Sequence, residues 1–237
     1  MPRRYLDAAP FRAAGFHATG TVMNSKRKLL ILGDGRFAVE ALEIAEAAGD
    51  FSPVGFVNSL VRPAPGASLE GLPVFWAEDV PFGPAECEVV CAIVTTERRA
   101  FIELMRARGY RFASLIHPFS NISRRARIAP GCIINAGAVI GSNAVLSEYT
   151  IVNRGALIGH DDQIGTCCTV GPGANIAGNV EIGEGVFVAQ GAVIRERLRV
   201  GNGAVVAAGA VVLEDVNAND MAAGIPARTI RSGVNGH

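Results

Sequence analysis

The sequence predicts two structural parts, a small α/β sheet of nucleotide-binding type followed by an all-β parallel β-helix. Two observations predict this: a strand, glycine turn and helix pattern that begins at Lys28, and an aliphatic residue that recurs every six positions from Ile122 onward. The length of 237 residues fits one large domain or two small ones. A hydrophobic content of 49% is sufficient for a substantial core.

The composition excludes several classes of protein. The 22 basic and 22 acidic side chains cancel, so nucleic-acid binding driven by bulk charge is disfavoured. No apolar stretch is long enough to predict a membrane span, and the N-terminal segment lacks the apolar core of a signal peptide, so we expect a cytoplasmic protein. The five cysteines are an odd number without zinc-ligand spacing, which indicates reduced thiols and no metal site.

Residues 1–27 are rich in arginine and show no periodicity before the first apolar run. We expect a disordered N-terminal extension, as untethered termini usually are.

Residues 28–117 predict a Rossmann-like domain. An apolar strand at 29–32 leads into Gly33-Asp34-Gly35 and then into an alanine-rich helix through residue 48. Glycines let the backbone turn tightly beside a phosphate, and the helix N-terminus offers unpaired N–H groups. Arg36, at the helix start, is either a solvated side chain or a phosphate contact.

Two further strands are expected at 54–57 and 89–94. The first ends in Asn58, close to where a dinucleotide fold places the acid that binds the ribose, so hydride chemistry with NAD is disfavoured. The second leads into Thr95 and a helix at 97–108 that ends at Gly109.

The hexad repeat is the strongest signal in the chain, because all sixteen positions from Ile122 to Val212 at this spacing are aliphatic. A small residue usually follows four positions later. This period is typical of a β-helix, in which short strands meet at tight corners and the coils stack. We therefore expect a β-helix over residues 118–217, with Cys132 and Cys168 as buried core thiols.

A three-sided coil takes three hexads, so side chains three hexads apart stack. His160 lies near a corner, above Ser142 and below Gly178, and we expect Gly178 to leave open space for a ligand beside the imidazole. The two carboxylates that follow, Asp161 and Asp162, can orient the ring and stabilise its protonated form, as general-base catalysis requires. Asp162 occupies a small-residue position, where it either bonds backbone at a distorted corner or poises the histidine.

Together these motifs resemble the hexapeptide-repeat acyltransferases that carry an N-terminal nucleotide-sugar domain, such as UDP-4-amino-sugar N-acetyltransferases and sialic acid O-acetyltransferases. The likeness covers about residues 28–231. It depends on five segments: Gly33-Asp34-Gly35, Gly55-Phe56-Val57-Asn58, Ile116-His117-Pro118, residues 153–161, and Gly224-Ile225-Pro226-Ala227-Arg228 in the C-terminal tail, residues 218–237.

The resemblance implies a left-handed β-helix, a homotrimer, and acetyl-CoA as co-substrate in the groove between neighbouring subunits. By analogy, His160 is the catalytic base and Asp161 orients it, while no metal takes part. The implied acceptor site comprises Gly33, Gly35, Arg36, Asn58, Thr95 and Asn153. The implied acetyl-CoA site comprises the backbone of Thr169, Gly171, Gly173 and Ala189, with Arg228 toward the nucleotide end.

The sequence departs from the family pattern at three places. Thr169 stands where members often carry a second histidine, Asn58 replaces a common acid, and Thr95 belongs to a Thr-Thr pair in place of a glycine-containing turn. His117, before Pro118, is expected to be structural.

We therefore predict an acetyl-CoA-dependent N-acetyltransferase acting on the amino group of a nucleotide-linked sugar in surface glycan biosynthesis. The alternatives are a sialic-acid-type sugar O-acetyltransferase and a non-catalytic nucleotide-sugar-binding protein. A β-helix zinc enzyme of carbonic-anhydrase type needs several histidines on adjacent coils, and the repeat contains only His160.

Overall fold

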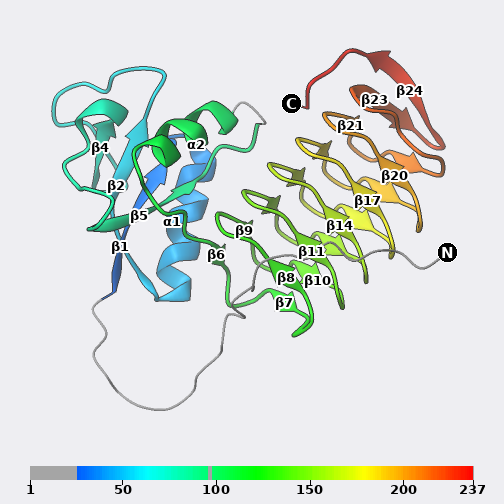
Figure 1. The fold of residues 1–237 in the computed structure, drawn as a ribbon, viewed down its shortest axis with the longest axis horizontal. Helices are drawn as coiled ribbons and strands as arrows, with labels where there is room; N and C mark the ends of the chain where they lie inside the picture. Colours follow the sequence, from blue (N-terminus) through cyan, green and yellow to red (C-terminus); the bar gives the residue numbers. More distant parts are fainter. Residues whose placement is uncertain (1–25, 96–97, 237) are drawn as a thin grey trace.

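The computed structural model describes residues 26–95 and 98–236. It has two parts side by side: a sheet with two helices, and a parallel β-helix whose first coils lie next to that sheet (Figure 1). The extension predicted for residues 1–27 lies outside the described residues, except for residue 26 and for Arg27, which begins the first strand.

The N-terminal sheet has five strands in the order β3-β4-β2-β1-β5. Strand β1 lies inside the sheet and is apolar on both sides, so its residues from Leu29 to Leu32 are fully buried, as expected of a parallel sheet covered on both faces. β3 pairs antiparallel and the other strands pair parallel. The bounds are β1 (Arg27–Leu32), α1 (Arg36–Ala48), β2 (Phe51–Asn58), β3 (Ser68–Leu69), β4 (Leu72–Trp76), the 3-10 helix η1 (Ala77–Asp79), β5 (Cys87–Cys91) and α2 (Arg98–Ala107).

The sequence located β1, β2 and both helices but not all of their bounds. The strand expected at 89–94 corresponds to β5, which begins and ends earlier than expected. It ends at Cys91 because the chain leaves the sheet there, and the carbonyl groups of Val94 and Thr95 accept hydrogen bonds from Arg98. The expected start of α2, residue 97, lies outside the described residues. β3 and β4 were missed, since they are short or edge-lying and contain Pro73.

The hexad repeat folds as a parallel β-helix, which confirms the main prediction. Each short strand pairs in parallel with the strand three hexads further along the chain, as in Val139 with Leu157 and Ile140 with Ile158. The aliphatic residue of each hexad points inward, and the small residues, Cys132 and Cys168 among them, fill the same core.

Three sheets form the sides of the β-helix, and we name each by its first strand. The β6 face contains β6 (Leu115–Ile116), β9 (Ile133–Ile134), β12 (Ile151–Val152), β15 (Thr169–Val170), β18 (Phe187–Val188) and β21 (Val205–Val206). The β7 face contains β7 (Asn121–Ile122), β10 (Val139–Ile140), β13 (Leu157–Ile158), β16 (Asn175–Ile176), β19 (Val193–Ile194) and β22 (Val211–Val212). The β8 face contains β8 (Arg127–Ile128), β11 (Val145–Leu146), β14 (Gln163–Ile164), β17 (Glu181–Ile182) and β20 (Arg199–Val200).

The segment expected as a C-terminal tail forms a hairpin at the far end of the β-helix (Figure 1). Strand β23 (Asp220–Gly224) pairs parallel with β21 and antiparallel with β24 (Ala227–Ser232). The hairpin therefore extends the β6 face and covers the last coil.

The N-terminal part packs on the first coils of the β6 face. Ile133 and Ile151 share one apolar cluster with α1, and Tyr149 and Cys167 share another with α2. The two parts are thus joined by a continuous core, which fixes the sheet relative to the coils that carry the candidate site.

Candidate active site

His160 lies at the corner that follows β13, with 63% of its side chain exposed. Its Nδ1 is 2.8 Å from Asp161 Oδ2. Asp161 adopts φ +60° at this corner, and its other oxygen accepts a hydrogen bond from Asn143 Nδ2 at 3.0 Å. The hydrogen bond with His160, followed by that from Asn143, lowers the pKa of Asp161. An ionised Asp161 accepts a hydrogen bond from Nδ1–H, which favours the tautomer whose Nε2 keeps its lone pair.

Gly178 lies directly beside the imidazole, as the stacking of hexads predicts. A Cβ at this position would lie 2.5 Å from His160 Nε2 and 2.7 Å from Cε1. The space that we expected to be open for a ligand is therefore occupied by the histidine ring itself, and that expectation was wrong. The glycine is needed because any side chain there would displace the ring.

Asp162 is fully buried. Its Oδ2 accepts the backbone N–H of Gly159 at 2.8 Å, and its Oδ1 accepts that of Val180 at 2.8 Å. The sequence left open whether Asp162 hydrogen-bonds the backbone or poises His160, and the structure shows the hydrogen bonds to the backbone. Burial raises the pKa of Asp162 to about 7, although the two backbone N–H bonds lower it.

Asn153 belongs to a different corner, the one that follows β12. It is buried, and its Oδ1 accepts the backbone N–H of Arg154 at 2.8 Å and lies 3.5 Å from Asn135 Nδ2. Both Asn135 and Arg154 reach Glu40 on α1. Within one chain, Asn153 therefore lies at the contact between α1 and the β-helix, and His160 lies at another corner.

The backbone groups predicted to contact acetyl-CoA are engaged in the coil ladder. The N–H of Gly171 donates to Val188 at 2.7 Å, that of Gly173 donates to Arg154 at 3.0 Å, and that of Ala189 donates to Val206 at 2.8 Å. These N–H groups stack as expected, but they do not point to a ligand. A co-substrate at this position would contact the side chains and carbonyl groups of the corner.

Thr169 is buried against the N-terminal part. Its hydroxyl donates to the Val94 carbonyl at 2.8 Å and accepts from Arg98 Nη1 at 2.9 Å. The side chain is thus a contact between the two parts of the protein, and no surface of it is left for a thioester.

Arg98, which the sequence analysis missed, is the largest fully buried side chain. Its recorded partners are carbonyl and hydroxyl oxygens: Val94 and Thr95 on its own part, and Tyr149, Cys167 and Cys168 besides Thr169 on the β-helix. Its Nε has no hydrogen-bond partner among the described residues. Desolvation lowers the pKa of this guanidinium. No sequence pattern distinguishes Arg98 from a surface arginine of an amphipathic helix.

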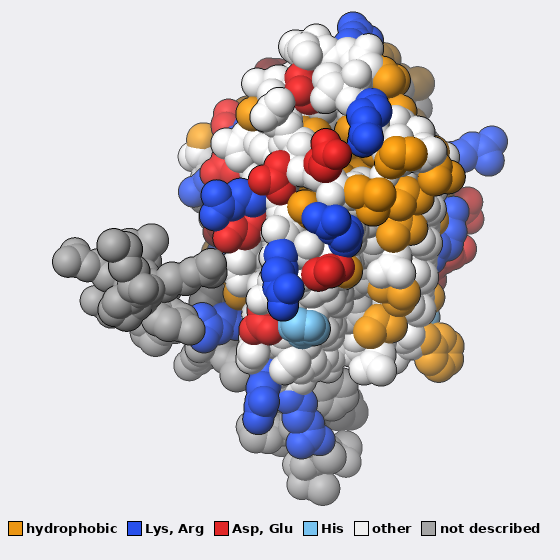
Figure 2. Space-filling view, turned by 90° about the vertical axis from the view of Figure 1, so that its right-hand side faces the viewer, with side chains coloured by type: hydrophobic (Ala, Val, Ile, Leu, Met, Phe, Trp, Pro, Cys, Tyr) orange, Lys and Arg blue, Asp and Glu red, His pale blue; other side chains and the backbone are white. Residues whose placement is uncertain are grey.

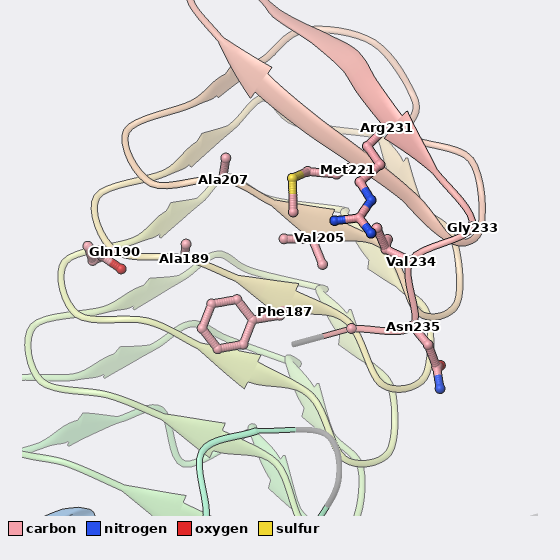
Figure 3. Close-up of a pocket in the computed structure, with 11 residues that line it drawn as sticks. Phe187, Ala189, Gln190, Val205, Ala207, Met221, Arg231, Gly233, Val234 and Asn235 are labelled. Atoms are coloured by element: carbon pink, nitrogen blue, oxygen red, sulfur yellow. The ribbon is translucent and has the colours of Figure 1, made fainter.

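A pocket of about 590 Å³ opens between the later coils of the β6 face and the C-terminal chain. Figure 3 shows Arg231 reaching from β24 over Val205 and Met221, with Ala189 at the opposite side. Ala189 is the one predicted co-substrate residue that lines this pocket. The remaining lining residues are Phe187, Gln190, Ala207, Gly233, Val234, Asn235 and Gly236.

Arg228 does not line that pocket. Its Nη1 lies 3.8 Å from Glu214 Oε1 and donates to the carbonyl of Ala227. The hairpin that carries the sequence motif therefore borders this pocket through Arg231 and not through Arg228, because which residue of β24 faces the pocket depends on the register with β23.

The predicted nucleotide residues lie together at the carboxyl ends of β1, β2 and β5. Gly33 adopts φ +108°, and a Cβ there would lie 3.1 Å from Ile93 Cγ1, so only glycine fits. Asn58 Nδ2 donates to Asp34 Oδ2 at 2.7 Å, and its Oδ1 accepts two backbone N–H groups of the following loop. Asp34, not predicted as a site residue, is thus the acid at this edge.

Gly35 and Arg36 begin α1 at the same edge. Gly35 is the N-cap and gives no side-chain cap, so N–H groups of the first turn remain for a ligand or water. The side chain of Arg36 is exposed beside these N–H groups. The backbone carbonyl of Thr95 accepts a hydrogen bond from the guanidinium of Arg98.

Residues 26–95 and 98–236 contain no group of three or more His, Cys, Asp or Glu side chains suited to a metal ion. In the same part of the chain, no helix has the length and apolar character needed to span a bilayer. Burial raises the pKa of Cys132 and of Cys168 to about 12, so both thiols are neutral core groups.

Comparisons with known proteins agree with this fold. Residues 163–196 match the family described as bacterial transferase hexapeptide (six repeats). Among curated proteins, no sequence matches this chain significantly. The acetyltransferase domain of PglB from Neisseria gonorrhoeae FA1090, solved with acetyl coenzyme A, is similar at 30% identity and a TM-score of 0.79, covering 87% of this chain and 100% of that one.

Two further solved structures are similar. PerB from Caulobacter crescentus, in complex with CoA and GDP-perosamine, is 27% identical with a TM-score of 0.76, covering 85% of this chain and 96% of that one. WeeI from Acinetobacter baumannii AYE, at 24% identity and a TM-score of 0.79, covers 86% of this chain and 100% of that one and shows the shared fold.

The hexapeptide repeats and the similarity to these acetyltransferases define an acyltransferase of the hexapeptide class. The chain belongs to the hexapeptide-repeat sugar acetyltransferases.

Proposed function

We propose that this protein transfers the acetyl group of acetyl-CoA to the amino group of a nucleotide-linked amino sugar in surface glycan biosynthesis. The observation that carries the proposal is the His160–Asp161 pair at 2.8 Å, at a corner where Gly178 gives the ring its place. The similarity to PglB with acetyl coenzyme A and to PerB with CoA and GDP-perosamine supports the choice of substrates.

The chemistry follows from the tautomer that Asp161 favours. His160 Nε2 accepts a proton from the sugar amine as its nitrogen attacks the thioester carbonyl, so that a C–N bond forms. Collapse of the tetrahedral intermediate breaks the C–S bond, and the CoA thiolate leaves and takes up a proton. Asp161 stabilises the imidazolium while it carries the proton.

The N-terminal part would supply the acceptor site as a Rossmann-like domain. In open parallel sheets, ligands bind at the carboxyl ends of the strands, where Gly33 and Asn58 lie together. The start of α1 at Gly35, with Arg36 beside it, suits a diphosphate. Thr95 would border the sugar from the end of β5.

Acetyl-CoA would occupy the pocket that Ala189 and Arg231 line. Its apolar wall, with Phe187 and Val205, suits the pantetheine chain and adenine, and the guanidinium of Arg231 suits a phosphate. The corners near Gly171 and Gly173 would lie along the same path. In this proposal, Arg231 takes the phosphate-binding role that the sequence had assigned to Arg228.

The catalytic unit would be a homotrimer of left-handed β-helices in the cytoplasm. The β8 face presents mainly polar or charged side chains, and the N-terminal part covers the start of the β6 face. The β7 face instead exposes Val139, Leu157 and Val193 in one column, in which Asn175 separates Leu157 from Val193. Figure 2, which views the right-hand side of Figure 1, shows hydrophobic side chains gathered beside a region of charged side chains. An exposed apolar column suits burial by another copy.

Such an assembly would also explain why Asn153 and His160 lie at different corners. If acetyl-CoA binds between subunits, the corner of one chain faces a different corner of its neighbour, and residues separated in one chain meet. Light scattering of the purified protein tests this: three times the chain mass supports the trimer, and a monomer contradicts it.

The function is tested by release of free thiol from acetyl-CoA in the presence of UDP-, GDP- and dTDP-linked 3-amino and 4-amino sugars. We expect turnover with at least one sugar, and a loss of about 10²- to 10⁴-fold in kcat/KM for His160→Ala. The matched control is His117→Ala. His117 lies at another corner, where its Nδ1 accepts the N–H of Phe119, so activity should persist.

Turnover that survives in His160→Ala would remove the histidine from the reaction. Absence of turnover with every amino sugar, together with nucleotide-sugar binding measured by calorimetry, would overturn the N-acetyltransferase assignment. It would favour either an O-acetyl acceptor or a binding protein.

A further inference from the structure

Asp162 occupies a column of the β-helix whose other members are apolar. The residues stacked with it in the same column are Ala144 below and Val180 and Leu198 above, all buried. An acid there must be desolvated, which costs free energy that a valine would not cost. Its presence therefore calls for a reason other than filling the core.

The first carboxylate oxygen replaces a bond between coils. At the same corner of the two neighbouring coils, the N–H groups of Gly141 and Ala177 donate to strand carbonyls of the next coil, those of Ile158 and Ile194. The N–H of Gly159, the residue before His160, donates instead to Asp162 Oδ2.

The second oxygen replaces a turn bond on the next coil. In the same column, the N–H of Ala144 donates to the carbonyl of Gly141, within its own turn. The N–H of Val180 donates instead to Asp162 Oδ1. Val180 follows closely after Gly178, against which the imidazole rests.

One buried carboxylate thus holds both backbone segments that determine where the ring lies. Gly159 fixes the start of the corner from which the side chain of His160 projects, and Val180 fixes the corner beneath the ring. The ring itself is bonded to Asp161, so Asp162 does not act by contacting it.

We propose that Asp162 is a positioning residue for the reaction, which holds the His160 and Gly178 corners at the separation that keeps Nε2 in place. This inference rests on the proposed role of His160 as the base. The proposal also explains why an acid occupies a position that usually carries a small residue. Folding does not require the acid there, because Val180 occupies the equivalent position on the next coil.

The test compares Asp162→Val and Asp162→Asn with the native protein. Valine reproduces the residue found at Val180, and asparagine retains the shape and one acceptor oxygen. We expect both variants to fold with a melting temperature at pH 8 no lower than that of the native protein. We expect kcat to fall about 10- to 100-fold for valine and less for asparagine, with KM for both substrates within about twofold.

The matched control is Leu198→Val, in the same column but two coils away. It should lower the melting temperature and leave kcat unchanged, because it removes packing without touching the corner at His160. A kcat loss as large in this control as in Asp162→Val would show that any damage to the column affects turnover, and would overturn the proposal.

A double-mutant cycle separates positioning from a general structural effect. In a His160→Ala background, Asp162→Val should change the residual rate by less than about twofold, because there is no imidazole left to position. An equal loss in both backgrounds would overturn the proposal. If His160→Ala itself retains full activity, the proposed function fails; if only Asp162→Val retains native kcat, this inference fails and the function stands.

Discussion

Gly178→Ala should disable the site without unfolding the protein. The Cβ that alanine adds would lie 2.5 Å from His160 Nε2, whereas ordinary contact begins near 3.4 Å. The ring must therefore move by roughly 1 Å, and a misplacement of that size costs about 10²-fold in rate. Since φ of Gly178 is not in the left-handed region that disfavours alanine, the backbone can accept the substitution.

Stability should change little. The side chain of His160 is 63% exposed, so the ring can swing outward, and we expect the free energy of unfolding to change by less than about 1 kcal/mol. The assay is thiol release under saturating and limiting amino sugar, with chemical unfolding alongside. Gly83→Ala is the matched control, because its Cβ would meet only Glu86 Oε2, at 3.5 Å.

A kcat/KM for Gly178→Ala that stays within about threefold of the native value would refute this reasoning. The same further loss in a His160→Ala background would also refute it, because the clash requires the imidazole. A loss of activity that accompanies global unfolding would place the effect on the backbone and not on the ring.

Two further predictions concern the pocket proposed for acetyl-CoA and the buried acid. Arg231→Ala should raise KM for acetyl-CoA about tenfold with kcat nearly unchanged, and the same variant should discriminate less between CoA and dephospho-CoA in calorimetry; unchanged affinity would place the phosphates elsewhere. Because burial raises the pKa of Asp162 from 3.8 to about 7, its contribution to stability is complete below about pH 4 and is lost as the pH rises through 7. The melting temperature should therefore fall from pH 5 to pH 8 in the native protein by more than in Asp162→Val, and parallel curves would contradict the raised pKa.

The β-helix could be predicted from sequence because its rule is local and repeated. Each hexad places one aliphatic residue inside, and a coil of three hexads follows from the three sides, so the stacking of His160 on Gly178 needed only arithmetic. The burial of Cys132 and Cys168 follows from the same rule. What the arithmetic does not give is the direction in which a corner side chain points, which is why the ring was expected beside a vacant space.

The contacts between the two parts could not be predicted, because they join residues far apart in sequence. Arg98 meets Thr169 across 71 positions, and this contact buries the side chain of a residue whose backbone the sequence had assigned to the co-substrate. Glu40 meets Arg154 in the same way. The choice between Arg228 and Arg231 likewise depends on the pairing of two strands, which a single motif does not determine.

The two adjacent acids show how backbone conformation divides roles that the sequence leaves identical. Asp161 adopts a positive φ at the corner, so its carboxylate lies outside, where the hydrogen bonds with His160 and Asn143 lower its pKa. Asp162 then enters the next strand at an inward position, where burial raises its pKa and its oxygens reach only backbone N–H groups. The ionised acid can therefore orient the imidazole electrostatically, and the buried acid can act only through geometry. If the outer carboxylate were buried and the inner one exposed, the imidazole would lose its oriented partner and the two corners would lose their shared acceptor. Both carboxylates would still be present in the sequence.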